Sequence, residues 1–218
     1  MNNLKVLYQD NHLIAVYKPA GLLVQADKTK DKCLMDYVKE YLKSKYNKPG
    51  KVFLGLLHRL DRPVAGIVLF AKTSKGAARL SEQIRNRTIK KQYTVLVSKI
   101  PEQDSAKLVH HLVKNELKNT SWAHENPQEN SKEAILEYTL ISQNSDGTAK
   151  LKVDLHTGRH HQIRSQLAAI GCPIVGDTKY GSKIPYMDGR SICLCASKLT
   201  FKKATEEEVV EIEVEPEF

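Results

Sequence analysis

The sequence predicts an α+β fold in which strands predominate, and three observations support this prediction. Many segments are short, rich in Val, Ile and Leu, and either alternate with polar residues or form brief apolar runs. Only three segments have the length and pattern of helices. The 218 residues contain no repeat and no linker rich in Gly or Ser. We therefore expect residues 1–218 to form one domain that buries roughly 70% or more of the surface exposed in the unfolded chain.

The first half of the chain is expected to begin with strands at residues 4–8 and 13–16. A helix follows at 33–46, where apolar residues recur at helical spacing until Lys48-Pro49-Gly50 ends it. The apolar run Ile67–Ala71 is typical of a strand buried on both faces. Ser74 is expected to cap a second helix that extends to about Arg87.

The second half is expected to contain mostly strands and one further helix. The strands are predicted at 92–99, 106–113, 134–141, 149–154 and 192–199. The segment 115–130 is polar and is expected to be an exposed loop, and 161–170 is expected to be a helix. Residues 209–214 alternate Val and Ile with Glu, as a half-exposed edge strand does.

The charge distribution favours a polyanionic partner. The chain has 34 Lys and Arg against 25 Asp and Glu, a net charge of +9. Seven of the acids are glutamates between residues 206 and 217, so residues 1–205 carry 34 basic against 18 acidic side chains, or +16. A body this basic attracts phosphate backbones with an affinity that falls as salt rises. A merely solvated basic surface is the alternative.

Other compositional features place limits on the class of protein. No stretch approaches the ~20 apolar residues of a membrane span, and the chain start lacks the apolar region of a signal peptide. The four cysteines include no Cys-x-x-Cys pair, which favours reduced thiols over a zinc site. We expect a cytoplasmic protein, monomeric and without an obligate protein partner or membrane attachment.

The strongest candidate for a functional site is the segment 57–72, with the sequence LHRLDRPVAGIVLFAK. Asp61 lies between Arg59 and Arg62 in the loop that leads into the apolar run, and Pro63 restricts the local backbone. Loops held by buried strands are common places for catalytic residues. The alternative is a structural ion pair between Asp61 and one of the two arginines.

This segment resembles the His-Arg-Leu-Asp catalytic motif of the RluA-type pseudouridine synthases. Three further segments match that family in the same order. They are 6–24 with its Lys18-Pro19-Ala20-Gly21 turn, Ile89–Tyr93, and the pair Leu155–Arg164 and Gly171–Gly181. Together the matches cover about residues 6–200. The family's usual Ser is Ala65 here, and we expect this departure to retune the site without abolishing activity.

The resemblance implies a mixed, mainly antiparallel central β-sheet flanked by helices and loops, with a catalytic cleft across the sheet. It implies isomerisation of uridine to pseudouridine in RNA, with Asp61 as the catalytic carboxylate. Arg164 is expected to keep that carboxylate charged and oriented. Tyr93 is expected to stack on the uracil and assist proton removal, with simple packing beneath the site as the alternative. No electrons or groups enter or leave, so no cofactor is expected.

The target base must leave its stack before reaction, and Arg62 is expected either to fill the vacancy or to contact a phosphate. Leu194 and Ile163 are expected to line the base pocket, although Leu194 could be an ordinary core residue. The candidate RNA-binding residues are Arg59, Arg62, His58, Lys72, Lys90, Lys91, Arg159, His160 and Lys179. His156 and His160 stand four apart, but the break at Gly158 argues against one helical face and hence against a metal site.

The few residues before the first matching strand suggest no separate N-terminal RNA-binding domain, so that substrate choice would come from the catalytic domain. The loops 25–32 and 115–130 are the expected places for that selectivity. Ribosomal RNA, transfer RNA or both are open as substrates. A non-catalytic RNA-binding protein or RNA chaperone is the alternative. A metal-dependent nuclease is disfavoured because the only dense carboxylate cluster is the C-terminal tail, whose alternating pattern suits an edge strand.

Overall fold

The computed structural model describes residues 4–187 and 189–218, which fold into two compact units. Unit 1 consists of the chain up to Ile89 together with Lys198–Glu215, and unit 2 consists of Lys90–Ser197 together with Pro216–Phe218. Residues 1–3, which belong to the chain start predicted to lack a signal peptide, lie outside the described residues. Whether the two units behave as one domain stays a prediction, as does the catalytic cleft.

Unit 1 is built on antiparallel strands with β4 in its core. β1 (Val6–Gln9) pairs with β2 (Leu13–Lys18), and β2 pairs with β4 (Ala65–Ala71). The short β3 (Gly55–Leu56) also pairs with β4. β11 (Val209–Glu213) pairs with the Lys198–Lys202 part of β10 (Leu194–Lys202), which is the edge position expected for the Val-Glu alternation. β4 is buried from Gly66 onward, as its apolar run predicted.

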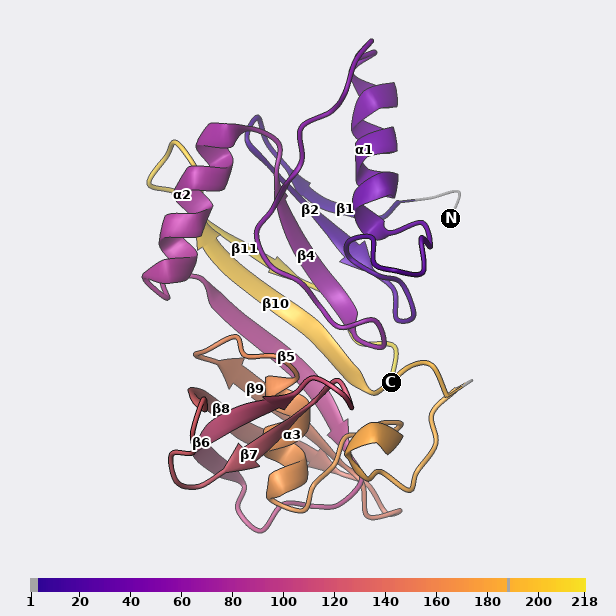
Figure 1. Cartoon of the computed structure of the whole chain (residues 1–218), viewed down its shortest axis with the longest axis vertical. Helices are drawn as coiled ribbons and strands as arrows, with labels where there is room; N and C mark the ends of the chain where they lie inside the picture. The colour runs from indigo at the N-terminus through magenta and orange to yellow at the C-terminus, as the bar shows by residue number, and fades with distance from the viewer. Residues whose placement is uncertain (1–3, 188) are drawn as a thin grey trace. The chain divides into compact units, whose positions relative to one another are not determined.

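Two helices lie on one face of the unit 1 strands (Figure 1). α1 (Leu34–Lys45) buries Leu34, Val38 and Leu42, so its predicted helical spacing is confirmed. α2 (Ser74–Arg85) is also confirmed, but the prediction of its cap was wrong. Thr73 has extended backbone angles and its Oγ1 accepts a hydrogen bond from the Gly76 N–H, whereas Ser74 is already the first helical residue.

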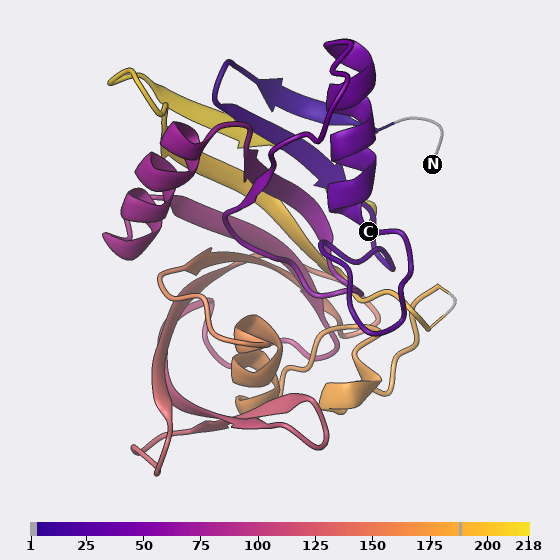
Figure 2. The same ribbon diagram turned by 45° about the horizontal axis from the view of Figure 1, so that its top comes forward.

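Unit 2 is a curved antiparallel sheet that surrounds a short helix, α3 (Gln162–Ala169) (Figure 2). The strands lie in the order β10, β5, β9, β8, β6 and β7, the first contributing its residues up to Ser197. Their bounds are Lys90–Val97 for β5, Ser105–Asn115 for β6, Thr120–His124 for β7, Lys132–Gln143 for β8 and Ala149–Leu155 for β9. A 3-10 turn, η1 (Thr178–Tyr180), follows α3.

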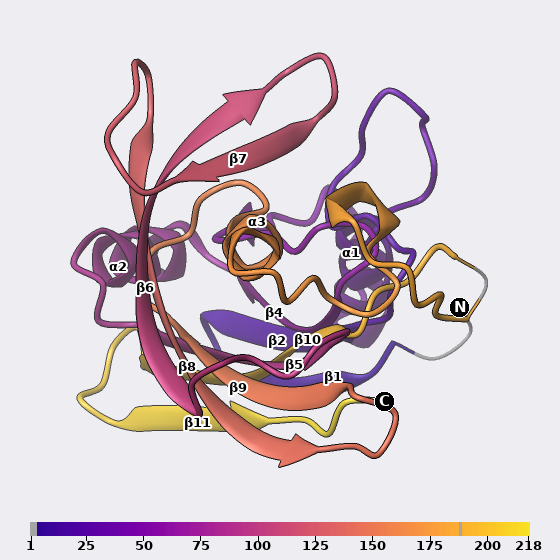
Figure 3. The same cartoon turned by 90° about the horizontal axis from the view of Figure 1, so that it is seen from below.

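The prediction of an exposed loop over 115–130 was wrong, because this segment contains β7. β6 and β7 form a hairpin in which Val113 pairs with Trp122 (Figure 3). The strand was missed because its buried side chains, Thr120 and Ser121, are hydroxyl-bearing, while its large apolar residue Trp122 is half exposed. A segment of polar composition can still form a strand when the neighbouring strand supplies backbone hydrogen bonds.

The short elements β3 and η1 were not predicted, and the remaining elements agree with the expected pattern to within a few residues at their ends. The α+β class with a mostly antiparallel pairing is therefore confirmed. In α3, His161 is the residue before the helix rather than part of it, and it adopts a left-handed backbone with φ of 52°. In the described part of the chain, no helix combines the length and apolar character needed to cross a membrane.

Candidate active-site residues

Asp61 lies in unit 1, in a short loop whose backbone is fixed on both sides. The neighbouring Leu60 and Val64 are buried, while Asp61 itself is half buried. The turn at Arg62 and Pro63 is closed by a 3.1 Å hydrogen bond from the Val64 N–H to the Asp61 carbonyl. This loop leads directly into the core strand β4, so the position of the carboxylate is set by rigid structure.

A buried lysine holds the same loop. Lys18 is fully buried at the end of β2, and its Nζ donates to the carbonyls of Pro19, Leu22 and Arg62 at 3.1, 2.8 and 3.2 Å. Burial lowers the pKa of Lys18 to about 7, against the opposing effect of the Asp61 charge. Lys18 was not among the predicted site residues, although its place in the Lys-Pro-x-Gly turn was the available signal.

The Lys-Pro-x-Gly turn and the Asp61 loop are also joined directly. The Gly21 N–H donates to the Arg62 carbonyl at 2.7 Å, and Arg62 Nε donates back to the Gly21 carbonyl at 3.0 Å. Arg62 Nη2 lies 3.0 Å from Asp31 Oδ2 in a half-exposed ion pair. Arg62 therefore ties the Asp61 loop to the 25–32 loop, one of the two segments expected to encode selectivity.

The other predicted residues of unit 1 have mixed surroundings. Arg59 is exposed, with Nη1 3.5 Å from Gln25 Oε1. His58 Nε2 accepts a 3.0 Å hydrogen bond from the Leu69 N–H, which fixes the ring against β4. Lys72, just after β4, donates to the Asp10 carbonyl and to the Tyr46 hydroxyl. Of the three, Arg59 is the most exposed to solvent.

Arg164 lies in unit 2 on α3, where it forms a buried ion pair with Asp177. Its Nε and Nη2 lie 2.7 and 2.8 Å from the two carboxylate oxygens, and the side chains are 6% and 1% exposed. The guanidinium also lies 5.0 Å from the centroid of the Tyr180 ring. A bidentate pair of this kind fixes the plane of the guanidinium as well as its position.

Gly176 allows Asp177 to reach this position. Its φ is +86°, and a Cβ at this residue would lie 2.8 Å from both the Ser191 carbonyl oxygen and Tyr186 Cβ. Only glycine satisfies both requirements. The Gly-Asp-x-x-Tyr-Gly segment, matched in sequence without an assigned role, thus supplies the carboxylate and the ring that surround Arg164.

Two histidines connect α3 to the β6–β7 hairpin. The Tyr180 hydroxyl accepts from the Ser121 N–H at 2.8 Å and lies 2.9 Å from His161 Nδ1. His160 stacks on His161 with ring centroids 3.9 Å apart, and its Nδ1 lies 2.9 Å from Ser121 Oγ. Burial, with a smaller effect of the Arg164 charge, lowers the pKa of His161 to about 2, so this imidazole is neutral.

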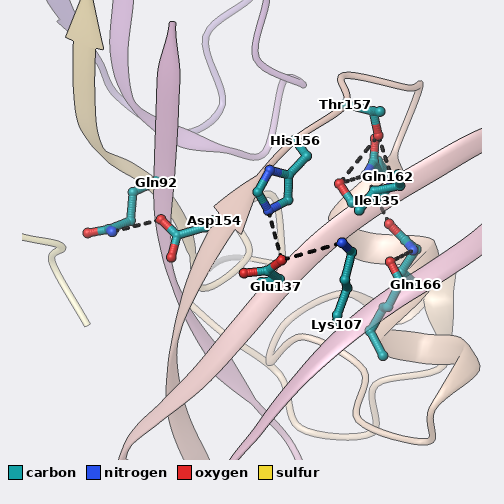
Figure 4. Close-up of polar contacts among 10 residues, drawn as sticks. Gln92, Lys107, Ile135, Glu137, Asp154, His156, Thr157, Gln162 and Gln166 are labelled. Carbon is teal, nitrogen blue, oxygen red and sulfur yellow. Dashed lines mark hydrogen bonds and ion pairs between the residues drawn. The ribbon is translucent and has the colours of Figure 1, made fainter. Parts of the chain in front are cut away.

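The opposite side of α3 is anchored by two buried glutamines (Figure 4). Gln162 Oε1 accepts from the Thr157 hydroxyl at 2.8 Å, and its Nε2 donates to the Ile135 carbonyl and to Gln166 Oε1. Gln166 Nε2 lies within 3.3 Å of the Leu108 and Ala134 carbonyls and 3.0 Å from His110 Nδ1. These contacts hold the Thr-Gly-Arg turn and α3 to β6 and β8.

The two histidines that stand four apart in sequence have separate partners. His156 Nε2 lies 3.4 Å from Glu137 Oε1 on the exposed side of the sheet (Figure 4). His160 instead contacts Ser121. The nearby Asp154 accepts from Gln92 Nε2 at 2.9 Å. Over residues 4–187 and 189–218, no three His, Cys, Asp or Glu side chains are grouped as a metal site would require.

The remaining predicted residues of unit 2 are distributed between the interior and the surface. Tyr93 in β5, Ile163 in α3 and Leu194 in β10 are buried, with 7%, 5% and 3% exposure. Burial lowers the pKa of Lys91, whose Nζ would lie 3.6 Å from a Cβ at Gly158. The exposed residues are Lys90, Arg159, whose Nε donates to the Glu133 carbonyl, and Lys179, whose Nζ lies 3.5 Å from the Asn119 carbonyl.

Several known proteins similar to this chain are named RNA pseudouridine synthases. A relative from Rickettsia felis, named ribosomal large subunit pseudouridine synthase C, is 32% identical over 87% of this chain and 62% of its own length. One from Pasteurella multocida, named dual-specificity RNA pseudouridine synthase RluA, is 28% identical over 99% of this chain and 94% of its own. The chain spans less than two thirds of the Rickettsia protein and 57% of an Aquifex aeolicus relative.

The fold is shared with a solved structure, human RNA pseudouridylate synthase domain containing 4. The two match with a TM-score of 0.80 and 21% identity over 97% of this chain and 88% of the human one. The family model described as RNA pseudouridylate synthase matches residues 12–169, a span that includes Asp61, Tyr93 and Arg164. The chain therefore belongs to the RNA pseudouridylate synthase family.

Proposed function

We propose that this chain is an RNA pseudouridine synthase and that Asp61 is its catalytic carboxylate. The observation that carries the proposal is the family match, which spans the Asp61 loop, β5 and α3. The fixed backbone around Asp61 supports it, since a catalytic carboxylate must be held in one geometry. The identification of Tyr93 and Arg164 as further active-site residues also rests on the family match.

The proposed reaction breaks the bond between N1 of uracil and C1′ of the ribose, turns the base, and joins C1′ to C5. The proton on C5 is then removed and N1 carries a hydrogen, so atoms and electrons balance without a cofactor. Asp61 would act either as a nucleophile on the ribose or base, or as a base that abstracts a ribose proton. Each route requires the ionised carboxylate, which a neighbouring guanidinium favours.

In this proposal Arg164 supplies that guanidinium and Tyr93 stacks on the uracil. The rigid hold of Asp177 on Arg164 supports the first role, because a guanidinium of fixed plane loses little entropy when it orients a partner. The burial of Tyr93 supports the second, since a buried ring offers a dry stacking surface. Leu194 and Ile163, both buried, would line the base pocket.

Substrate binding would require the target uridine to leave its stack, at a cost of a few kcal/mol. Arg62 would fill the vacancy or contact a phosphate, after giving up its exposed pair with Asp31. Arg59, His58, Lys72, Lys90, Lys91, Arg159, His160 and Lys179 are the other proposed RNA contacts. We propose ribosomal RNA, transfer RNA or both as substrates, with the protein acting as a cytoplasmic monomer.

The proposal is tested by mapping pseudouridine in total RNA from source cells with the gene intact, deleted, or replaced by Asp61→Ala. We expect loss of pseudouridine at the same defined uridines in the deletion and in the Asp61→Ala strain. If the Asp61→Ala strain keeps every site that the deletion loses, Asp61 is not catalytic. If purified protein binds RNA but forms no pseudouridine on RNA from the deletion strain, it is an RNA-binding protein instead.

The origin of substrate choice is tested separately by exchanging loops with a relative. Arg62 connects the 25–32 loop to the Asp61 loop, which supports a role for that segment in selectivity. Replacing residues 25–32 with the corresponding loop of a relative of different specificity should shift the modified sites. The same exchange over 116–119, the turn of the β6–β7 hairpin, tests the second segment. Unchanged site choice in both exchanges would remove the loops as determinants.

A further inference from the structure

Lysine and tyrosine side chains of α1 and its C-terminal end contact Gln9 of β1 and Lys72, which follows β4. Figure 1 shows α1 beside β1. We define this α1–β1 surface by Gln9, Tyr41, Lys45, Tyr46, Lys48 and Lys72. Gln9 lies at its centre, since its Nε2 donates to the Tyr46 hydroxyl at 2.7 Å and its Oε1 accepts from Tyr41 and Lys45. One side-chain amide thus joins both tyrosines and a lysine.

The ammonium groups of this surface are held by phenols. Lys45 Nζ donates to the Tyr41 hydroxyl at 3.0 Å, and this hydrogen bond raises the pKa of Lys45. Lys72 Nζ donates to the Tyr46 hydroxyl at 3.2 Å. Lys72 and Lys48 also lie 5.1 and 5.9 Å from the centroid of the Tyr46 ring, which is 46% exposed. Such cation–π contacts attract a lysine without cancelling its charge.

These three lysines have no carboxylate partner among the residues that the structure describes. Lys72 Nζ donates a hydrogen bond to the backbone carbonyl of Asp10. The Asp10 carboxylate instead accepts from the Tyr8 hydroxyl and from the N–H groups of His12 and Leu13. Lys198, Lys202 and Lys203 of the same unit differ, since each forms an ion pair with one or two glutamates. Unit 1 therefore contains one group of lysines that are ion-paired with glutamates and another group whose charge is not balanced by an ion pair with a described residue.

The positive charge of the three lysines indicates a negatively charged ligand. Lys48 and Lys72 share one ring and Lys45 joins them through Gln9, so three like charges gather and none of them is ion-paired with a carboxylate in residues 4–187 and 189–218. A polyanion with regularly spaced charges relieves that repulsion and releases its own counterions. We propose that the α1–β1 surface binds the RNA phosphate backbone, independently of sequence. The inference takes RNA as ligand and Lys72 as a contact from the proposed function, and it extends that contact to Lys45 and Lys48, which the proposed function does not include.

The contribution of each lysine to binding can be measured through its salt dependence. A phosphate contact changes the slope of log K against log salt by roughly 0.7 to 0.9. The triple variant Lys45→Gln, Lys48→Gln and Lys72→Gln should therefore reduce the slope by about 2 and weaken RNA binding on the order of tenfold at low salt. The loss should be similar for RNAs of different sequence, because phosphate contacts carry no base information.

The experiment titrates a fluorescein-labelled 20-nucleotide RNA by fluorescence anisotropy at 50 to 200 mM KCl, with every variant made in the Asp61→Ala background. The matched control is Lys198→Gln, Lys202→Gln and Lys203→Gln, which removes the same charge from paired lysines. A reduced slope only in the first triple variant supports the surface. Equal losses in both, or no loss in the first, would overturn it.

Three further controls keep the outcome interpretable. Thermal unfolding identifies a folding defect, and the double variant Lys45→Gln, Lys48→Gln tests the surface without disturbing the contact of Lys72 with Asp10. Titration with polyglutamic acid covers the other kind of partner, since a loss confined to that ligand would mean an acidic protein and overturn the inference. The titrations measure binding alone, so they remain decisive even if pseudouridine mapping shows that Asp61 is not catalytic.

Discussion

The loop that holds Asp61 and the helix that holds Arg164 are stabilised in different ways. In unit 1, the Asp61 loop is held by hydrogen bonds to backbone carbonyls from two side chains, the buried Lys18 and the exposed Arg62. Burial lowers the pKa of Lys18 to about 7. In unit 2, Arg164 is held by a buried carboxylate, and its helix by neutral amides. The first arrangement depends on a titratable group near neutral pH, and the second depends on filled, buried hydrogen-bond networks.

The Asp61→Asn substitution removes the charge of Asp61 while keeping the shape of its side chain. We expect Asp61→Asn to lower kcat/KM on a target RNA on the order of 10³-fold or more, because the amide is neither nucleophile nor base. Stability should change little, since the loop is fixed through its backbone. Pseudouridine formation is measured by mass spectrometry of digested RNA. Activity within tenfold of the wild type would rule out the catalytic role.

Breaking the Arg164–Asp177 pair should produce the largest loss of stability. Asp177→Ala leaves a buried guanidinium without its carboxylate, and such a loss costs about 3–5 kcal/mol. The measurement is the free energy of unfolding in urea. Lys107→Ala is the matched control, because it breaks a 3.8 Å pair with Glu137 that is exposed and contributes about 0–1 kcal/mol. Equal losses in the two variants would show that the buried pair has no special weight.

The glutamine network of unit 2 should have an intermediate effect. Gln166→Leu keeps the size of the side chain but leaves the Leu108 and Ala134 carbonyls without the amide that they accept from. Buried groups left unsatisfied cost about 1–3 kcal/mol in total stability. We expect a destabilisation in this range, independent of pH between 7 and 9. Gln143→Leu, at an exposed position of β8, is the control.

Much of the fold follows from local patterns that the sequence displays. The helical spacing of Leu34, Val38 and Leu42 predicted α1, and the unbroken apolar run predicted the buried β4. β7 was missed because pairing with β6 and contacts to His160 and Tyr180 stabilise polar residues that have no periodic pattern. The cap of α2 was misplaced by one residue because Ser is the stronger capping residue in isolation, whereas the packed chain uses the neighbouring Thr73.

The surroundings of the proposed site residues do not follow from the motifs that nominate them. Motifs nominate Asp61, Tyr93 and Arg164, whose roles stay proposals, but Asp177 lies 13 residues from Arg164 and a sequence does not show that the two meet. The three carbonyl acceptors of Lys18 come from two separate turns, and its burial is a property of the packed chain. Spacing can indicate which residues react, whereas long-range packing decides what holds them.

The most specific prediction concerns the pH dependence of unit 1. In the folded state the pKa of Lys18 is lowered from 10.5 to about 7, so between these values the unfolded chain binds more protons than the folded one. Stability from this group therefore rises with pH across the window from 7 to 10.5, by at most about 1.4 kcal/mol per pH unit. Below pH 7 both states are protonated and the contribution is constant.

The prediction is tested by subtracting the unfolding free energy of Lys18→Met from that of the wild type at pH 6, 7, 8 and 9. The subtraction removes the titration of all other groups that the substitution leaves unchanged, and Lys43→Met, exposed on α1, is the control for replacing a lysine by methionine. We expect a difference that increases with pH for Lys18 and that exceeds any change measured for Lys43→Met. A difference that stays flat for Lys18 would mean that the carbonyls of Pro19, Leu22 and Arg62 keep the ammonium charged, since three acceptors match its three protons. The contrast between the two regions would then lie only in the groups that hold them, carbonyl acceptors around an ammonium in one and a carboxylate bound to a guanidinium in the other.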